Sequence, residues 1–233
     1  MEEFVGVTIS DLSGRYLPLT LKSTNSFLKF HNTKLIVYII GDAELPIVDD
    51  RIEIIHVPNS DYGAHNFKIL HQGYLSHINI LIQKLLCLTK HQNFIFFEND
   101  VFFFKNMKDI WENMCDGVGF VPVNRMLLNS GLIMSKNTDV INYTEEDIIK
   151  FFTEKRVHHP CDEFLTNWCA KQALRLGDDA CILVVPPSCN KKIYTLNTTC
   201  HSVHCVEGKH FILNPERYKK IPVFITELLK KIN

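Results

Sequence analysis

The sequence predicts one α/β domain built on a mixed, mostly parallel β-sheet with helices on both faces. Through the first half, short apolar runs alternate with segments that have the periodicity of helices. Several of these runs are apolar without interruption, which is typical of strands buried on both faces of a parallel sheet. The length of 233 residues suits one such domain over 1–233, so no second domain is needed.

The individual elements follow from these patterns. Residues 34–40 (KLIVYII) form a continuous apolar run that ends at Gly41, and residues 74–89 carry Leu and Ile at helical spacing. Strands are expected at 5–9, 34–40, 51–56, 94–97, 102–104, 117–123, 131–134 and 182–185, and helices at 17–30, 74–89, 107–114, 145–154, 162–173 and within 223–231.

Composition limits the classes of function. Hydrophobic residues make up 46% and charged residues 22%, as in soluble globular proteins, and the net charge of −1 argues against a broad nucleic-acid-binding surface. No apolar run approaches the roughly 20 residues of a membrane span, and the start, MEEFVGVTIS, is acidic where a signal peptide would be basic. We therefore expect a cytoplasmic protein without a transmembrane segment; its oligomeric state does not follow from the sequence.

Eight cysteines raise the question of disulfides or zinc. The chain has no CxxC pair and no secretory signal, so reduced and mostly buried thiols are expected. Cys200 and Cys205, with His201 and His204 between them, form an alternative zinc site, although their spacing is not a standard one.

Residues 94–104, FIFFENDVFFF, carry the strongest functional signal. Glu98, Asn99 and Asp100 interrupt two aromatic runs that would each form a buried strand. A carboxylate within such apolar surroundings needs a cation or hydrogen-bond donors, so Glu98 and Asp100 are candidate metal ligands. Ligands bind beyond the carboxyl ends of the strands in parallel sheets, which favours a functional role for this turn.

This segment resembles the metal-binding DxD strand of the GT-A nucleotide-sugar glycosyltransferases, especially the glycogenin and lipopolysaccharide-galactosyltransferase type. The resemblance covers FIFFENDVFFFKNMKDIW as a whole. Glu98 stands where the first Asp is usual, which keeps the carboxylate but lengthens the side chain.

Further segments resemble the same family in the same order, over roughly residues 3–212. They are Thr8, Ser10 and Tyr16-Leu17-Pro18 near the start; Asn129-Ser130-Gly131, similar to N-[ST]-G; Asp162-Glu163-Phe164-Leu165, similar to DQDxLN; Val185-Pro186-Pro187 with Asn190, similar to LPxxxN; and 204–211 (HCVEGKHF), similar to HxxGxxKPW. The last is one residue short and lacks the Pro-Trp, so His201 remains an alternative to His204 as metal ligand.

The resemblance implies a nucleotide-binding half up to about residue 105 and an acceptor and sugar half from about 106. It also implies a role for each matching residue. Thr8, Ser10 and Tyr16 would meet the nucleotide, Lys84, Asn99, Asn129, Ser130 and Gly131 the donor sugar side, and Lys209 the diphosphate; Glu98, Asp100 and His204 would bind the metal; Asp162 would lie nearest the anomeric carbon, with Glu163 on sugar hydroxyls.

Two of these residues have structural interpretations that remain open. Lys84 has apolar neighbours on its helix and could extend to solvent. Asp162 could serve as the N-cap of the helix that starts there, with Glu163 favourable to the helix dipole.

The expected activity is a metal-dependent transfer of a sugar, hexosyl or pentosyl, from a UDP-sugar to an acceptor hydroxyl. Carboxylate and imidazole ligands suit Mn²⁺, with Mg²⁺ as the alternative, because the ion must neutralise charge on the leaving diphosphate. The resemblance favours retention of the anomeric configuration, while an inverting enzyme would use Asp162 or Glu163 as a base.

Other classes stay open. A catalytically weak or inactive relative that binds a nucleotide sugar or a glycan is the main alternative, because of Glu98. A nucleotidyltransferase would need a basic, Gly-rich phosphate loop, and residues 10–15 hold only one Gly and one Arg. The acceptor is not defined; the polar segments 61–67 and 155–161 are candidates for binding it.

Overall fold

The structure is a computed structural model that describes residues 4–14, 16–123, 127–177, 179–184 and 200–205, and the single positions 212, 226 and 230. The elements, in chain order, are β1 (Val5–Ser10), α1 (Tyr16–Phe30), β2 (Leu35–Ile40), β3 (Ile52–Val57), α2 (Gln72–Leu75), α3 (Ile78–Leu88), β4 (Phe94–Phe97), β5 (Val101–Phe103), α4 (Lys108–Asn113), β6 (Gly117–Pro122), β7 (Leu128–Lys136), α5 (Glu145–Glu154), α6 (Pro160–Trp168), β8 (Ala173–Arg175), β9 (Cys181–Val184) and β10 (Ser202–Cys205).

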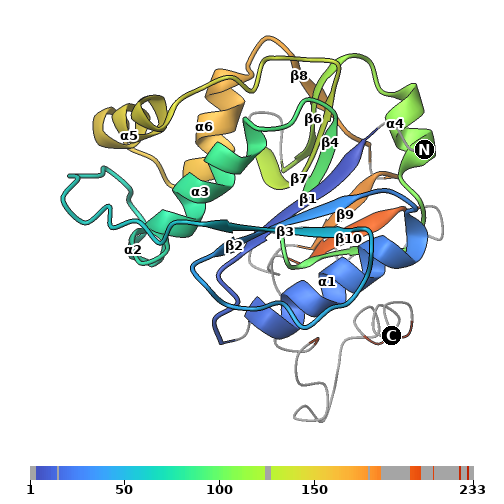
Figure 1. Ribbon diagram of the computed structural model, residues 1–233. Helices are drawn as coiled ribbons and strands as arrows, with labels where there is room; N and C mark the ends of the chain where they lie inside the picture. Colours follow the sequence, from blue (N-terminus) through green and yellow to red (C-terminus); the bar gives the residue numbers. More distant parts are fainter. Residues whose placement is uncertain are drawn as a thin grey trace.

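A seven-stranded sheet in the order β3-β2-β1-β4-β7-β6-β8 forms the centre of the molecule (Figure 1). The strands β3, β2, β1 and β4 pair in parallel, and β7 alone runs antiparallel to its neighbours β4 and β6. The prediction of a mixed, mostly parallel sheet flanked by helices is therefore confirmed. Because β1 and β4 are central, both are buried and their carboxyl ends open at the same edge.

Two apolar cores cover the two faces of this sheet. Phe94 and Phe96 of β4 face the core that includes α3, α5 and α6, whereas Ile95 and Phe97 face the core that includes α1. Figure 1 shows these three helices on one side of the sheet, and α1 together with β9 and β10 on the other. The alternation of side chains along a strand explains why β4 must be apolar at every position.

A second, three-stranded sheet has the order β5-β10-β9 and packs beside α1 (Figure 1). Here β10 pairs antiparallel with β5 and parallel with β9. The two aromatic runs of FIFFENDVFFF are thus two strands of different sheets, and the polar triplet between them is the point at which the chain passes from one sheet to the other.

Several boundaries differ from the prediction. The helix expected at 74–89 is two helices, because the chain breaks at Ser76 and His77 between α2 and α3. The helix expected at 162–173 ends at Trp168, and Ala173 instead begins β8. Neither β8 nor β10 was predicted, since each is short and, unlike β4, β5 and β9, is not a continuous apolar run. The helix expected within 223–231 lies outside the described residues.

Two further expectations can be compared with the described residues. No disulfide joins any of the described cysteines, and all of them except Cys115 are buried. Within the part of the chain that the structure describes, no helix combines the length and the apolar character that a bilayer crossing requires.

Candidate metal and donor site

The turn after β4 holds the acidic triplet and is fixed by backbone hydrogen bonds on both sides. The Glu98 N–H donates to the Gly131 carbonyl at 2.8 Å, and the Val101 N–H donates to the Glu98 carbonyl at 3.0 Å. From α1, the Ser23 hydroxyl donates to the Val101 carbonyl at 2.6 Å. The polar turn can lie between two aromatic strands because its buried backbone groups find these partners.

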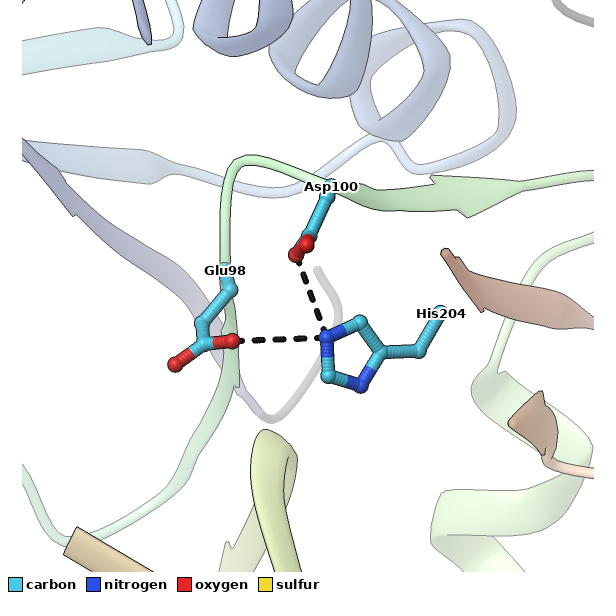
Figure 2. Close-up of side chains that lie close together, drawn as sticks. All are labelled: Glu98, Asp100 and His204. Carbon is cyan, nitrogen blue, oxygen red and sulfur yellow. Dashed lines mark ion pairs between the residues drawn. The ribbon is translucent and has the colours of Figure 1, made fainter. Parts of the chain in front are cut away.

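His204 reaches this turn through β10. The register pairs His204 with Val101, and the Cys205 N–H donates to the Asp100 carbonyl at 2.9 Å. Its Nε2 lies 3.1 Å from Asp100 Oδ1 and 3.3 Å from Glu98 Oε2. Figure 2 shows the ring directed at both carboxylates. Possible ligand atoms of the three residues lie within 4.8 Å of one another, and they are the only such group among the described residues. The structure therefore brings together the three residues that the sequence predicts as metal ligands.

Two alternatives were open from the sequence: His201 as a metal ligand, and a zinc site at Cys200 and Cys205. Neither forms a metal-binding group among the described residues. The His201 ring lies 2.9 Å from the Asp179 carbonyl through its Nδ1 and is not part of the acidic group. Cys200 and Cys205 are buried, but no group that includes them has metal-ligand geometry among the described residues.

Asn129 fixes the orientation of the His204 ring from the other side. Asn129 Oδ1 lies 2.9 Å from His204 Nδ1 and also accepts the Gly131 N–H at 2.9 Å. Because this oxygen is an acceptor, His204 Nδ1 carries a hydrogen and Nε2 is the nitrogen that faces the carboxylates. Metal-binding histidines are commonly held in this way, with the second nitrogen hydrogen-bonded to an oxygen.

An irregularity in the pairing of β6 and β7 directs Asn129, Ser130 and Gly131 to the site. Phe120 pairs with Ile133, but the next residue, Val121, pairs with Asn129, so β7 has three extra residues at this point. Such bulges bend a strand and redirect its side chains. Gly131 is needed there because a Cβ at this position would overlap the His204 ring.

The electrostatics of the three residues favour a cation between them. Burial alone would lower the pKa of His204, but Asp100 and Glu98 outweigh it and raise the pKa to about 9. Burial would raise the pKa of Glu98, but Lys84 and His204 hold it well below its usual value. A position where a buried and a partly buried carboxylate stabilise an additional proton is also favourable for a metal ion, which competes with that proton for Nε2.

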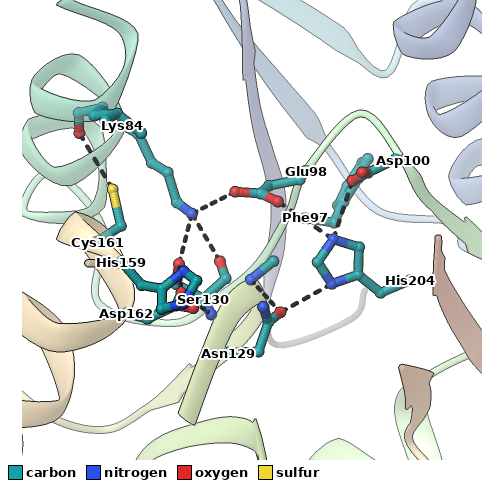
Figure 3. Close-up of polar contacts among 12 residues, drawn as sticks. Lys84, Phe97, Glu98, Asp100, Asn129, Ser130, His159, Cys161, Asp162 and His204 are labelled. Atoms are coloured by element: carbon teal, nitrogen blue, oxygen red, sulfur yellow. Dashed lines mark hydrogen bonds and ion pairs between the residues drawn. The ribbon is translucent and has the colours of Figure 1, made fainter. Parts of the chain in front are cut away.

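A second group of polar residues adjoins the first (Figure 3). The buried Lys84 ammonium donates to Glu98 Oε1 at 2.7 Å and, at 2.9 Å each, to the carbonyl and hydroxyl oxygens of Ser130. In turn, the Ser130 N–H and hydroxyl donate to Asp162 Oδ1. Burial raises the pKa of Asp162 in spite of these donors. The structure therefore connects Lys84 to Asp162, and Lys84 does not extend to solvent.

The N-cap interpretation of Asp162 is wrong. The cap of α6 is His159, and Asp162 lies in the first turn. The carboxylate that satisfies the helix start is Glu163, whose Oε1 accepts the N–H groups of His158 and His159 at 2.7 and 2.8 Å. Asp162 is left to face Ser130.

The residues expected at the nucleotide lie at the end of β1 and the start of α1. The hydroxyl of Thr8 donates to the Phe97 carbonyl at 2.7 Å, and the hydroxyl oxygen of Ser10 accepts from the Leu12 N–H and the Thr20 hydroxyl. Both side chains are buried, whereas Tyr16 is partly exposed and its ring packs edge-on against His77. Asn99 is buried in the turn itself. Lys209 and the 185–190 segment lie outside the described residues.

Two residues near the site were not predicted. Tyr74 lies beside α6, with its hydroxyl oxygen 3.2 Å from His159 Nδ1, and burial together with the charges of Asp162 and Glu98 raises its pKa to about 12. Ser23 supports the acidic turn after β4 from α1. The only signal for Ser23 in the sequence was the group of small hydroxyl residues Ser23, Thr24 and Ser26, in a helix that would otherwise be expected to bury larger side chains.

The arrangement of elements matches solved glycosyltransferase structures. Galactosyltransferase LgtC, in complex with donor and acceptor sugar analogs, has a TM-score of 0.65 with 11% sequence identity, over 94% of this chain and 98% of that chain. Mouse xyloside xylosyltransferase 1, in its apo form, has a TM-score of 0.58 with 8% identity, over 86% and 96% of the two chains. The bifunctional glycosyltransferase WbbM has a TM-score of 0.62 with 8% identity, over 99% of this chain and 52% of that one.

The chain has the GT-A fold. The predicted resemblance is thus confirmed at the level of the fold, at sequence identities too low to carry an activity with it. No protein-family model and no curated protein matches the chain. In this GT-A fold, the acidic group occupies the carboxyl end of the central strand β4.

Proposed function

We propose that this protein is a metal-dependent glycosyltransferase that moves a sugar from a UDP-sugar to an acceptor hydroxyl, with retention of the anomeric configuration. The observation that carries the proposal is the group of Glu98, Asp100 and His204 at the carboxyl end of β4. In open α/β sheets this edge is where nucleotides and other ligands bind. The GT-A fold and the order of the motifs support the same reaction class.

The donor atoms of this group fit a divalent ion such as Mn²⁺. Glu98 and Asp100 offer carboxylate oxygens, and His204 offers Nε2 because Asn129 holds the hydrogen of Nδ1. When bound, the ion would neutralise charge on the leaving diphosphate of the donor. Magnesium is the less suitable ion, since it prefers oxygen ligands and water.

The residues around the metal group would hold and orient the donor sugar. Asp162 is partly buried next to Ser130, close to the same turn, and its carboxylate would lie nearest the anomeric carbon. Glu163 would act mainly by fixing the start of α6, with its second oxygen on a sugar hydroxyl. Tyr16 would pack on the nucleotide base and Lys209 would meet the diphosphate.

The test is a screen of UDP-sugars for Mn²⁺-dependent hydrolysis, preceded by thermal unfolding with UDP, with Mn²⁺ and with both. The proposal requires that UDP and Mn²⁺ together raise the Tm more than either alone, and that at least one UDP-sugar releases UDP only when the metal is present. Binding without turnover, under every acceptor, would instead indicate a nucleotide-sugar or glycan binding module. Absence of both binding and turnover would exclude the proposal.

Product stereochemistry is a separate measurement. NMR of the transferred sugar distinguishes an α-product from a β-product when the donor is an α-linked UDP-sugar. A β-product would contradict retention and would assign Asp162 or Glu163 the role of a base on the acceptor hydroxyl.

A further inference from the structure

Lys84 is a buried cation whose hydrogen-bonding capacity is fully used by the protein. The residue is only 3% exposed, and an ammonium group has three N–H donors. Three acceptors surround it: Glu98 Oε1 at 2.7 Å, and the carbonyl and hydroxyl oxygens of Ser130, each at 2.9 Å. No N–H of Lys84 is left over for a donor sugar, so any effect of Lys84 on the site must pass through Glu98 and Ser130.

Glu98 is held at both ends of its carboxylate. Oε1 accepts from Lys84, while Oε2 lies 3.3 Å from His204 Nε2 (Figure 3). Lys84 comes from α3 and His204 from β10, which lie on opposite sides of the β4 end. One carboxylate can reach both only if its side chain is long enough, which gives a physical reason for Glu at the position where the DxD motif that this segment resembles has Asp.

Ser130 extends the same chain of hydrogen bonds to Asp162. Its hydroxyl oxygen accepts from Lys84, and its own hydrogen goes to Asp162 Oδ1, which also accepts the Ser130 N–H. Each hydrogen bond from Lys84 through Ser130 to Asp162 has one donor and one acceptor, so the direction of donation is the same along the whole series. Lys84 thereby sets the positions of two carboxylates, one in the metal group and one beside it.

We infer that Lys84 is a positioning residue, matched in length to Glu98, that holds Glu98 toward the metal group and Asp162 toward the donor sugar. Its relation to the metal rests on the proposed function. The hydrogen-bonded pair itself does not, because Lys84 Nζ and Glu98 Oε1 are joined by a direct contact of 2.7 Å. The length of the two side chains is the property that distinguishes this inference from a general need for positive charge near the site.

The experiment changes the lengths of the Glu98 and Lys84 side chains in opposite directions. Glu98→Asp shortens the carboxylate by one methylene, and Lys84→Arg lengthens the cation by one bond, so the double variant restores the combined reach. Affinity for Mn²⁺ is measured by EPR of the free ion, with and without UDP. Lys84→Met and Glu98→Asp should each weaken Mn²⁺ binding by about 10- to 100-fold, the usual effect of losing a residue that orients a metal ligand.

Two variants complete the design. The double variant Lys84→Arg with Glu98→Asp should recover most of the affinity that Glu98→Asp loses. Lys90→Met, which removes an exposed lysine just after the same helix, should bind Mn²⁺ as the unmodified protein does. The inference is overturned if Glu98→Asp binds Mn²⁺ as tightly as the unmodified protein, or if the double variant recovers nothing.

Thermal unfolding without metal separates this inference from the proposed function. Glu98→Asp and Lys84→Arg should each lower the Tm by about 5 °C, and the double variant should regain most of the loss. If the unmodified protein binds no Mn²⁺ but the Tm values follow this pattern, the metal-dependent function fails and the matched pair stands. If the Tm losses simply add, the matched pair is wrong.

Discussion

His31 and His204 are two buried histidines that have similar partners at Nδ1 and different partners at Nε2. Each is at most 2% exposed. In each, Nδ1 lies next to an oxygen, the Phe27 carbonyl at 2.8 Å for His31 and Asn129 Oδ1 at 2.9 Å for His204. In both rings Nδ1 therefore carries a hydrogen.

The difference is at Nε2. In His31, Nε2 accepts the backbone N–H of Met107 at 3.0 Å, and the ring lies among Phe4, Phe27 and Phe103. Burial lowers the pKa of His31 to about 4, because a second proton would have no acceptor. In His204, Nε2 faces two carboxylates, which outweigh burial and raise the pKa to about 9.

The comparison shows that burial alone does not decide what a histidine does. A ring whose two nitrogens are both satisfied by the backbone joins two elements, here the end of α1 and the start of α4. A ring with one nitrogen fixed and the other directed at carboxylates is prepared for a cation. Four predictions follow from this difference, from the largest expected effect to the smallest.

Removing Asp100, one of the two carboxylates that face His204 Nε2, should eliminate metal binding at this histidine. Asp100→Ala is expected to abolish Mn²⁺-dependent binding of UDP and of donor, because the ion loses its most deeply buried oxygen ligand. Calorimetric titration with Mn²⁺ and UDP measures this. Asp109→Ala, which removes an exposed carboxylate of α4, serves as the control and should bind normally. Binding by Asp100→Ala would exclude Asp100 as a ligand.

Lowering the pH should act at His31 by reducing the stability of the fold, and not by changing metal binding. The pKa of this residue is about 4 when folded and 6.5 when unfolded, so the unfolded state takes up a proton first. Its stabilising contribution is complete above pH 6.5 and is lost as the pH falls toward 4. The free energy of unfolding should decrease by about 3 kcal/mol over that interval.

Urea denaturation at pH 7, 5.5 and 4 tests this expectation against His31→Gln. Other groups titrate in the same range, so the difference between the two proteins isolates the contribution of His31. An equal loss in both proteins would show that His31 does not titrate as its surroundings imply.

The acceptor at Nδ1 can be removed for one histidine only. For His31 it is a backbone carbonyl, but for His204 it is the Asn129 side chain. Asn129→Leu should weaken Mn²⁺ binding by about 10- to 100-fold, because the ring loses the bond that fixes its tautomer. Asn129→Asp keeps an oxygen at that place and should lose less. Equal losses in the two variants would assign Asn129 a role in packing alone.

Packing against the ring provides the smallest expected effect. Gly131→Ala would place a Cβ where the His204 ring lies, so the ring must shift and Mn²⁺ affinity should fall by about tenfold. In Gly63→Ala the new Cβ would meet only the flexible Asp61 side chain at 3.0 Å, and no change is expected. Unchanged Mn²⁺ affinity in Gly131→Ala would mean that the ring position tolerates movement.

Local sequence was sufficient for most of the fold. The strands β1, β2, β3 and β4 are continuous or nearly continuous apolar runs, and α5 has the predicted bounds, because its Thr144 cap and apolar stripe are encoded within a few residues. The failures are short or interrupted elements. The break at Ser76 and His77 carries neither Gly nor Pro, and β8 is three residues long.

The candidate site divides in the same way. Glu98 and Asp100 could be identified because they are two residues apart and follow a recognisable strand. The choice between His201 and His204 could not be made, because it depends on the pairing of β10 with β5. A shift of that register by one residue would turn His204 away from Asp100.

What the sequence determined by itself is therefore most of the helices and strands, the acidic turn after β4 and the set of polar residues from which a site could be built. These depend on periodicity and on neighbours within a few positions. Tertiary structure alone decided that His204 contacts Asp100, that Lys84 donates to Glu98 and that Ser130 donates to Asp162. Each of these contacts joins residues from different elements, and no local pattern encodes the distance between them, because sheet register and helix packing fix it only when the whole core assembles.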